Sequence, residues 1–218
     1  MRLVVFDVDG TLVDSQGLIL TAMDSAFAGA GLAPLPREQV LSIVGLSLPV
    51  AVGYLLPGAL PEQQDRVVEG YKTAYAAARS AQAAPLYPGV ASCLDRLAAR
   101  DDLLLAVATG KSRRGLDAVI ATHGWQGRFI SLQTADGHPS KPHPSMLHAA
   151  MSDAGVGPAD AVMIGDTSFD MQMAGNAGMT GFGVAWGYHT RDALIQTCAA
   201  RIFDDFASLT QAIEEWSA

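Results

Sequence analysis

The sequence predicts an α/β fold, in which a Rossmann-like three-layer core with a mostly parallel sheet carries an inserted helical cap domain. In the core, short apolar runs typical of buried parallel strands alternate with segments of helical periodicity. Between residues 16 and 83, by contrast, helical patterns follow one another and no segment resembles a strand. We therefore assign residues 1–15 and 84–218 to the α/β core and residues 16–83 to the cap.

The inserted segment contains four helical patterns, separated by glycine and proline residues that interrupt helices. The first begins after a capping residue, Asp14 or Ser15, and extends to about Gly29. Two short helices are expected at 39–44 and 49–55. The fourth extends from residue 61 to about 83 and places on one face Val67, Val68, Tyr71 and Tyr75.

The core elements follow from the position and spacing of apolar residues. Strands are expected at the apolar runs 3–6, 103–108, 129–133, 161–164 and 181–185. Helices are expected at 90–98, around 116–120, at 144–154 and at 168–177. The chain ends in an amphipathic helix, because apolar residues recur there at steps of three, four and three: Phe206, Leu209, Ile213 and Trp216.

Composition indicates a soluble cytoplasmic protein, a monomer or homodimer, with no membrane or nucleic-acid partner. Of the 218 residues, 50% are hydrophobic and 17% charged, yet no run is long enough to cross a membrane and no signal-peptide pattern opens the chain. The formal net charge is −8 and no basic stripe is visible, which disfavours nucleic-acid binding. Cys93 and Cys198 lie far apart in helical-looking segments, so we expect buried thiols rather than a disulfide.

The segment Phe6–Asp14, F-D-V-D-G-T-L-V-D, holds the most informative pair of residues. Asp7 and Asp9 follow an apolar run and precede Gly10, and ligand sites in open α/β sheets lie beyond the carboxyl ends of strands. Two carboxylates at this spacing suit a nucleophile with an acid/base partner, or a single metal site. Taken alone, the segment is also compatible with a solvated Asp-Gly turn.

Three further segments place polar residues directly after apolar runs. Thr109-Gly110-Lys111-Ser112 follows one run, Lys141 lies in S-K-P-H-P after the next, and Gly165–Asp170 follows a third. Because the carboxyl ends of parallel strands meet at one edge of a sheet, six side chains are expected to share a crevice: Asp7, Asp9, Thr109, Lys141, Asp166 and Asp170. Their four carboxylates would repel an anionic substrate, so charge alone predicts a divalent cation.

In this order and strand context, the four segments resemble the four motifs of the haloacid dehalogenase superfamily. D-V-D-G-T-L corresponds to the first motif, Thr109 to the second, Lys141 to the third and G-D-T-S-F-D to the fourth. The helical insert and the segment Leu86–Val90 are similar to the phosphoglycolate phosphatase-like branch, and the resemblance covers nearly the whole chain. It implies a Mg²⁺-dependent phosphatase that hydrolyses a small phosphomonoester, a phosphoglycolate-like metabolite, through an aspartyl-phosphate intermediate.

The resemblance also implies a role for each carboxylate at a matching position. Asp7 would be the nucleophile, and Asp9 the general acid and then the general base. Mg²⁺ would be bound by Asp7, by the backbone carbonyl of Asp9 and by Asp166, since this ion prefers oxygen ligands. Asp170, one helical turn beyond Asp166, would orient a metal-bound water.

The substrate phosphate is expected to be bound by the Thr109 hydroxyl, the Gly110 N–H at a helix start and the Lys141 ammonium. Outside this context, Thr109 could be an ordinary helix cap and Lys141 a solvated loop lysine. The prolines on either side of His143 restrict the backbone near Lys141, which fits an inward-facing lysine. The T-G-K-S stretch also resembles the end of a nucleotide-binding P-loop, but Leu105 stands where that motif requires its first glycine.

Three other functions share parts of this pattern. A phosphomutase of the β-phosphoglucomutase type or a pyrophosphatase would use the same chemistry, and a phospho-receiver switch would keep the aspartyl phosphate as a signal. The insert and Asp9 argue against a receiver, which needs neither. The loop at 44–48 carries no cation, which argues against a mutase. The sequence leaves open which basic residues of the insert face the cleft: Arg37, Arg66, Lys72 or Arg79.

Overall fold

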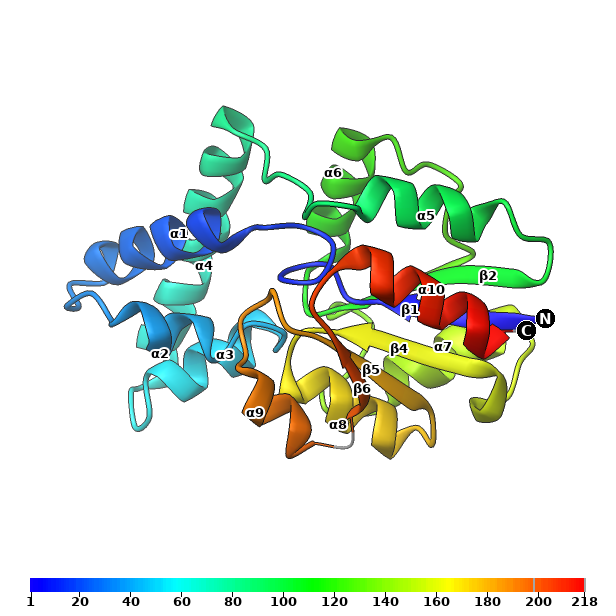
Figure 1. The fold of residues 1–218 in the computed structure, drawn as a ribbon. Coiled ribbons are helices and arrows are strands. Elements are labelled where there is room, and N and C mark those ends of the chain that lie inside the picture. The colour runs from blue at the N-terminus through cyan, green and yellow to red at the C-terminus, as the bar shows by residue number, and fades with distance from the viewer. Residues whose placement is uncertain (198, 218) are drawn as a thin grey trace.

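Six parallel strands form one sheet at the centre of the computed structural model, which describes residues 1–197 and 199–217 (Figure 1). The strand order is β3-β2-β1-β4-β5-β6, and every pairing is parallel. The strands are β1 Arg2–Phe6, β2 Leu103–Thr109, β3 Ser131–Thr134, β4 Ala161–Gly165, β5 Thr180–Val184 and β6 Ala199–Phe203. The predicted α/β class with a parallel sheet is confirmed.

Helices cover both faces of this sheet, as expected when the central strands β1, β2 and β4 are continuous apolar runs (Figure 1). One apolar cluster contains Val4 and Phe6 of β1 together with side chains of α5 Val90–Ala98, α6 Arg113–His123 and α10 Phe206–Ser217. The other contains Leu3 and Val5 together with side chains of α7 Ser145–Ala154 and α8 Ser168–Asn176. Alternate residues of β1 therefore enter opposite cores, which gives the three layers.

Four helices lie beyond the carboxyl ends of the strands and pack around an apolar cluster of their own (Figure 1). They are α1 Gln16–Gly29, α2 Arg37–Leu41, α3 Leu48–Leu55 and α4 Pro61–Ala81. The longest two, α1 and α4, cross closely at Gly70, where an added Cβ would lie 3.3 Å from the Ala26 Cα. All four fall within the segment predicted to be a helical insert.

The last part of the core differs from the sequence-based prediction. Strand β6 and the short helix α9 Arg191–Ile195 were not predicted, nor was the 3₁₀ turn Pro158–Asp160. Strand β6 is an edge strand with exposed side chains at Ala200 and Arg201, so it lacks the continuous apolar run of a central strand. Cys93 is a buried free thiol in α5, whereas Cys198 lies outside the described residues.

Among the described residues, no helix combines the length and the apolar character that crossing a membrane requires.

Candidate active site

Asp7 directly follows β1 at the centre of the sheet and is buried. Its backbone N–H donates to the Ile164 carbonyl at 2.9 Å, which ties it to the neighbouring strand β4. The Lys141 Nζ lies 2.9 Å from its Oδ1 as an ion pair. Within the described part of the chain, however, neither carboxylate oxygen accepts a hydrogen bond of acceptable geometry. Such unsatisfied buried oxygens are costly, so they mark a place for a ligand.

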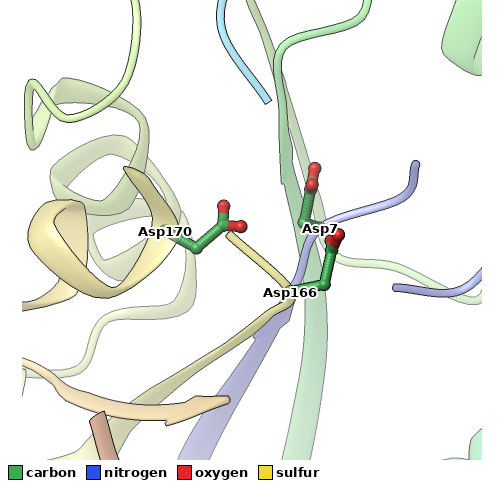
Figure 2. A group of neighbouring side chains, drawn as sticks. All are labelled: Asp7, Asp166 and Asp170. Atoms are coloured by element: carbon green, nitrogen blue, oxygen red, sulfur yellow. The ribbon is translucent and has the colours of Figure 1, made fainter. Parts of the chain in front are cut away.

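Asp166 follows β4 and lies beside Asp7 at the ends of two adjacent strands (Figure 2). Thr11 donates to its Oδ1 and the Tyr188 N–H donates to its Oδ2, each at 2.8 Å. The backbone approaches this carboxylate so closely that an added Cβ at Gly10 would lie 2.2 Å from the Asp166 Oδ2. Gly10 also has a φ of +82°, so the first turn of the site depends on glycine for both reasons.

Asp170 faces this pair from the first turn of α8 (Figure 2). Its Oδ2 accepts hydrogen bonds from the Thr167 N–H at 3.0 Å and the Thr167 hydroxyl at 2.6 Å, completing a capping box. Its Oδ1 accepts from the Lys141 Nζ at 2.6 Å. Burial by itself would lower the pKa of Lys141, but Asp170 and Asp7 outweigh it and raise that pKa. Lys141 is therefore a buried, charged link between Asp7 and α8.

These three carboxylates form a compact cluster that fits a divalent cation. Asp7, Asp166 and Asp170 each offer an oxygen within 4.8 Å of the others. Burial raises the pKa of Asp7 to about 7, with Asp170 and Asp9 adding to the effect and Lys141 opposing it. Burial, followed by Asp170 and Asp7, likewise raises the pKa of Asp166. A bound cation would relieve this repulsion and would coordinate the Asp7 oxygens, which accept no hydrogen bond within the described residues.

Asp9 lies outside that cluster and has partners of its own. The Lys111 Nζ donates to both of its carboxylate oxygens at 2.8 Å, and the Ser15 hydroxyl donates to its Oδ1. The same Nζ donates to the Tyr75 hydroxyl of α4 at 3.1 Å. Ser15 occupies the N-cap position of α1 but makes no side-chain capping bond, because its hydroxyl is turned to Asp9.

Lys111 was not predicted as a site residue: within the T-G-K-S stretch, only Thr109 and Gly110 were assigned to the site. The useful signal was its position two residues beyond the end of β2, at the edge where the other polar residues were expected to meet.

Thr109 ends β2 and is buried, and Gly110 follows it. The expectation that these residues begin a helix is wrong by a few positions: α6 begins at Arg113, and its N-cap is Ser112, whose hydroxyl accepts from the Gly115 N–H at 3.2 Å. An added Cβ at Gly110 would lie 2.6 Å from the carbonyl oxygens of both Gly45 and Leu46. Glycine is thus required here by the close approach of the α2–α3 loop.

That loop, residues 42–47, contacts the core at several of the predicted motifs. The Ser47 N–H donates to the hydroxyl of Ser140, the residue before Lys141, at 2.9 Å. The His189 Nε2 lies 3.2 Å from the Ser42 carbonyl oxygen. The helical segment is therefore docked against the edge of the sheet that carries the carboxylates.

Between the docked helices and the sheet lies a cavity of about 400 Å³, which Asp7, Asp9, Thr109 and Gly110 help to line. Four cationic side chains also line it: Lys72 and Arg79 from α4, and Lys111 and Arg114 from the α6 side. The 44–48 loop carries no cation, as the sequence indicated, but the cavity as a whole does. The absence of a cation in that loop is therefore a weaker argument against a second anionic group than the sequence suggested.

The fold and this site define a class of protein: a three-layer α/β protein with a Rossmann-like parallel sheet and a cluster of carboxylates at the carboxyl ends of its central strands. The chain belongs to the haloacid dehalogenase-like hydrolase family, whose model matches residues 4–184. It is 37% identical to the probable phosphatase IndB of Dickeya dadantii, over 96% of this chain and 92% of that protein. It is 30% identical to a phosphoglycolate phosphatase of Haemophilus influenzae, over 95% of this chain and 96% of that one.

A solved hydrolase from Pseudomonas syringae shares the fold, with a TM-score of 0.88 and 24% identity over 99% of both chains. The family match and the two relatives named as phosphatases show that the chain is a phosphoric monoester hydrolase.

Proposed function

We propose that the protein is a Mg²⁺-dependent phosphatase that hydrolyses a small phosphorylated metabolite through an aspartyl phosphate on Asp7. The observation that carries the proposal is the Asp7 carboxylate itself, which is buried, ion-paired to Lys141 and free of hydrogen bonds within the described part of the chain. The ion pair holds this carboxylate in place, and no hydrogen bond within the described residues occupies its oxygens. It can therefore attack an electrophile that enters the cavity.

In the first step, an Asp7 oxygen forms a bond to phosphorus and the ester P–O bond breaks. Asp9 gives its proton to the departing alkoxide oxygen as general acid. In the second step, water attacks phosphorus, Asp9 takes a proton from that water, and the acyl-phosphate bond breaks to release inorganic phosphate and free Asp7. The Lys141 ammonium, the Thr109 hydroxyl and the Gly110 N–H stabilise the phosphoryl oxygens.

The divalent ion would be held by Asp7, Asp166 and the backbone carbonyl of Asp9. It would neutralise charge between the carboxylates and the substrate phosphate. Asp170 belongs to the same carboxylate cluster, but both of its oxygens already accept hydrogen bonds from Lys141 and Thr167. Orientation of a metal-bound water by Asp170 stays a prediction, and its contacts favour an additional role in positioning Lys141.

We further propose that residues 16–83 act as a cap domain over residues 1–15 and 84–218. The docked loop and the cavity between these helices and the sheet support this division. A cytoplasmic location and a monomeric or homodimeric state stay predictions from the sequence.

The proposal is tested by incubating the purified protein with Mg²⁺ and phosphomonoesters and following inorganic phosphate. Phosphoglycolate is the natural first substrate because relatives at 30% identity carry that name. Turnover in ¹⁸O-water should place one labelled oxygen in the released phosphate and none in the Asp7 carboxylate, because water attacks phosphorus and Asp7 keeps its own two oxygens. With hexose 1-phosphates, isomerisation that a bisphosphate stimulates, without stoichiometric phosphate release, would instead establish a mutase.

A further inference from the structure

The cavity beside the carboxylates is large for the leaving group of a two-carbon acid phosphate. Its volume of about 400 Å³ lies within the range of pockets, roughly 300–1,000 Å³, that enclose drug-sized ligands. Phosphorus must sit at Asp7, so most of this space is left for the part of the substrate that departs.

The walls that face this space are mainly apolar. They come from α1, from the α2–α3 loop and from the start of α3: Ile19, Met23, Ile43, Val44, Leu46 and Leu48. Apolar walls give no hydrogen bonds to a small, fully hydrophilic leaving group, which would keep its water instead. They favour a leaving group with apolar faces of its own.

Two aromatic rings line the part of the cavity that the leaving group would occupy. Tyr71 and Tyr75 of α4 line the cavity and stack on each other, with ring centroids 5.6 Å apart and an interplanar angle of 23°. Tyr75 reaches the Lys111 ammonium, which in turn contacts Asp9. Because Asp9 must protonate the departing oxygen, a leaving group that extends away from phosphorus past Asp9 meets this pair of rings.

None of the four cationic side chains that line the cavity is both buried and available to bind a second anionic group of the substrate. Lys72 is exposed and forms an ion pair with Glu69 at 2.6 Å, and Arg114 is exposed as well. Lys111 is occupied by Asp9. Arg79 is half-buried near the end of α4. Exposed cations at the cavity can attract a phosphate ester to a protein of net charge −8, whereas the interior selects by shape and apolar contact.

We infer that the substrate is a phosphomonoester whose leaving group carries a planar ring, of about the size of a nucleoside 5′-monophosphate, with the ring packed against Tyr71. The inference rests on the proposed function and narrows its substrate class. Stacking of a planar ring on an aromatic side chain tolerates many ring types, so the ring's presence matters more than its identity.

The first test compares esters that differ by the ring alone. Uridine 5′-monophosphate and ribose 5-phosphate share the phosphate and the sugar, and phosphoglycolate serves as the two-carbon reference. We expect kcat/KM for the nucleotide to exceed that for either other ester by about tenfold or more. If ribose 5-phosphate or phosphoglycolate is turned over as well as the nucleotide or better, the inference is wrong while the phosphatase function stands. If no ester releases phosphate with Mg²⁺, the proposed function itself fails.

The second test asks whether Tyr71 carries the preference. Tyr71→Ala should reduce the ratio of the two kcat/KM values, nucleotide over ribose 5-phosphate, by about tenfold, and Tyr71→Phe should retain that ratio. The matched control is Tyr54→Ala, since Tyr54 is 68% exposed on α3 and does not line the cavity, so its ratio should equal that of the wild type. An equal loss for both esters in Tyr71→Ala would assign Tyr71 to packing of the helices and overturn the inference.

Discussion

Lys111 donates hydrogen bonds to both carboxylate oxygens of Asp9, at 2.8 Å each, and so connects the loop after β2 to the segment after β1. Burial by itself would lower the pKa of Lys111, but Asp9 and Tyr75 outweigh it and raise that pKa. Lys111 is therefore a fixed positive charge beside the proposed acid/base residue. Its further bond to Tyr75 extends this contact to the docked helices.

Replacing Lys111 should impair catalysis by misplacing Asp9. Lys111→Met removes the two bonds that orient this carboxylate, and we expect kcat to fall by roughly 10- to 100-fold, the scale associated with misplaced catalytic groups. Arg113→Met is the control, because Arg113 is an exposed neighbour that pairs with Asp117 on the surface. Steady-state kinetics on both variants decide the matter, and an unchanged kcat in Lys111→Met would show that Asp9 needs no such support.

Asp7→Asn and Asp9→Asn should reduce turnover in different ways. Asp7→Asn removes the nucleophile, so no acyl phosphate forms and turnover is lost. Asp9→Asn removes proton transfer, which costs about 10²–10⁴-fold in rate. The loss in the first step should be smaller for a nitrophenyl ester, whose leaving group needs little protonation. Rapid-quench detection of the phosphorylated protein distinguishes the two, and near-normal turnover by Asp7→Asn would remove Asp7 from the role of nucleophile.

Metal dependence should be strict and selective. Chelation by EDTA should abolish turnover, Mg²⁺ should restore it, and Ca²⁺ should not, because Ca²⁺ takes looser shells with more ligands. The measurement is phosphate release after dialysis against each ion. Asp166→Asn should raise the Mg²⁺ concentration that gives half-maximal activity. Full activity in demonstrably metal-free wild type would exclude Asp166 as a ligand.

The stability of the metal-free protein should depend on pH through Asp7. Burial raises its pKa from 3.8 to about 7, so the folded state binds this proton more tightly than the unfolded chain does. Asp7 therefore opposes folding increasingly as pH rises from about 4 to 7, by on the order of 4 kcal/mol at most.

This effect can be isolated by urea unfolding in EDTA at several pH values. The unfolding free energy of Asp7→Asn minus that of the wild type should grow as pH rises from 4 to 7 and then level off. Mg²⁺ should remove most of the difference by stabilising the wild type. Asp24→Asn, an exposed change on α1, is the control. A difference that stays constant with pH would mean that Asp7 ionises normally in the fold.

A side chain at Gly110 should disturb the docking of the helices without unfolding the core. Gly110→Ala places a Cβ 2.6 Å from two backbone carbonyl oxygens of the α2–α3 loop, which must move away. We expect a lower kcat/KM and increased hydrogen exchange in residues 42–47, with little change in the sheet. Gly17→Ala is the control, because its added Cβ meets no atom within 4 Å among the described residues beyond its chain neighbours and its own helical backbone. Alanine there should stabilise α1 by about 0.5–1 kcal/mol.

The central strands could be predicted because β1, β2 and β4 are buried on both faces and read as continuous apolar runs. Their carboxyl ends meet at one edge by topology, so the positions of Asp7 and Asp166 followed from the strands alone. The edge strand β6 could not be found in this way, since two of its five side chains are exposed and only one is buried.

Side-chain partners were harder to predict than positions. Ser15 has the residue type and place of a helix cap, yet its hydroxyl binds Asp9 instead. The Asp9–Lys111 pair joins residues 102 positions apart, and no local pattern specifies such a contact. The apolar cavity is likewise a product of how α1 and α4 pack, which helical periodicity does not determine.

The central place of β1 in the sheet has a consequence for the order of folding. Phe6, the residue before Asp7, pairs with Val107 on one side and with Ile164 on the other. A nascent chain thus carries Asp7, the proposed nucleophile, early in synthesis but gains both flanking strands only when about three quarters of the polypeptide, up to Gly165 of 218 residues, has been made. Pairings between such distant segments form slowly. During refolding, recovery of hydrolysis should therefore lag behind the appearance of helical circular dichroism and report the completion of the sheet.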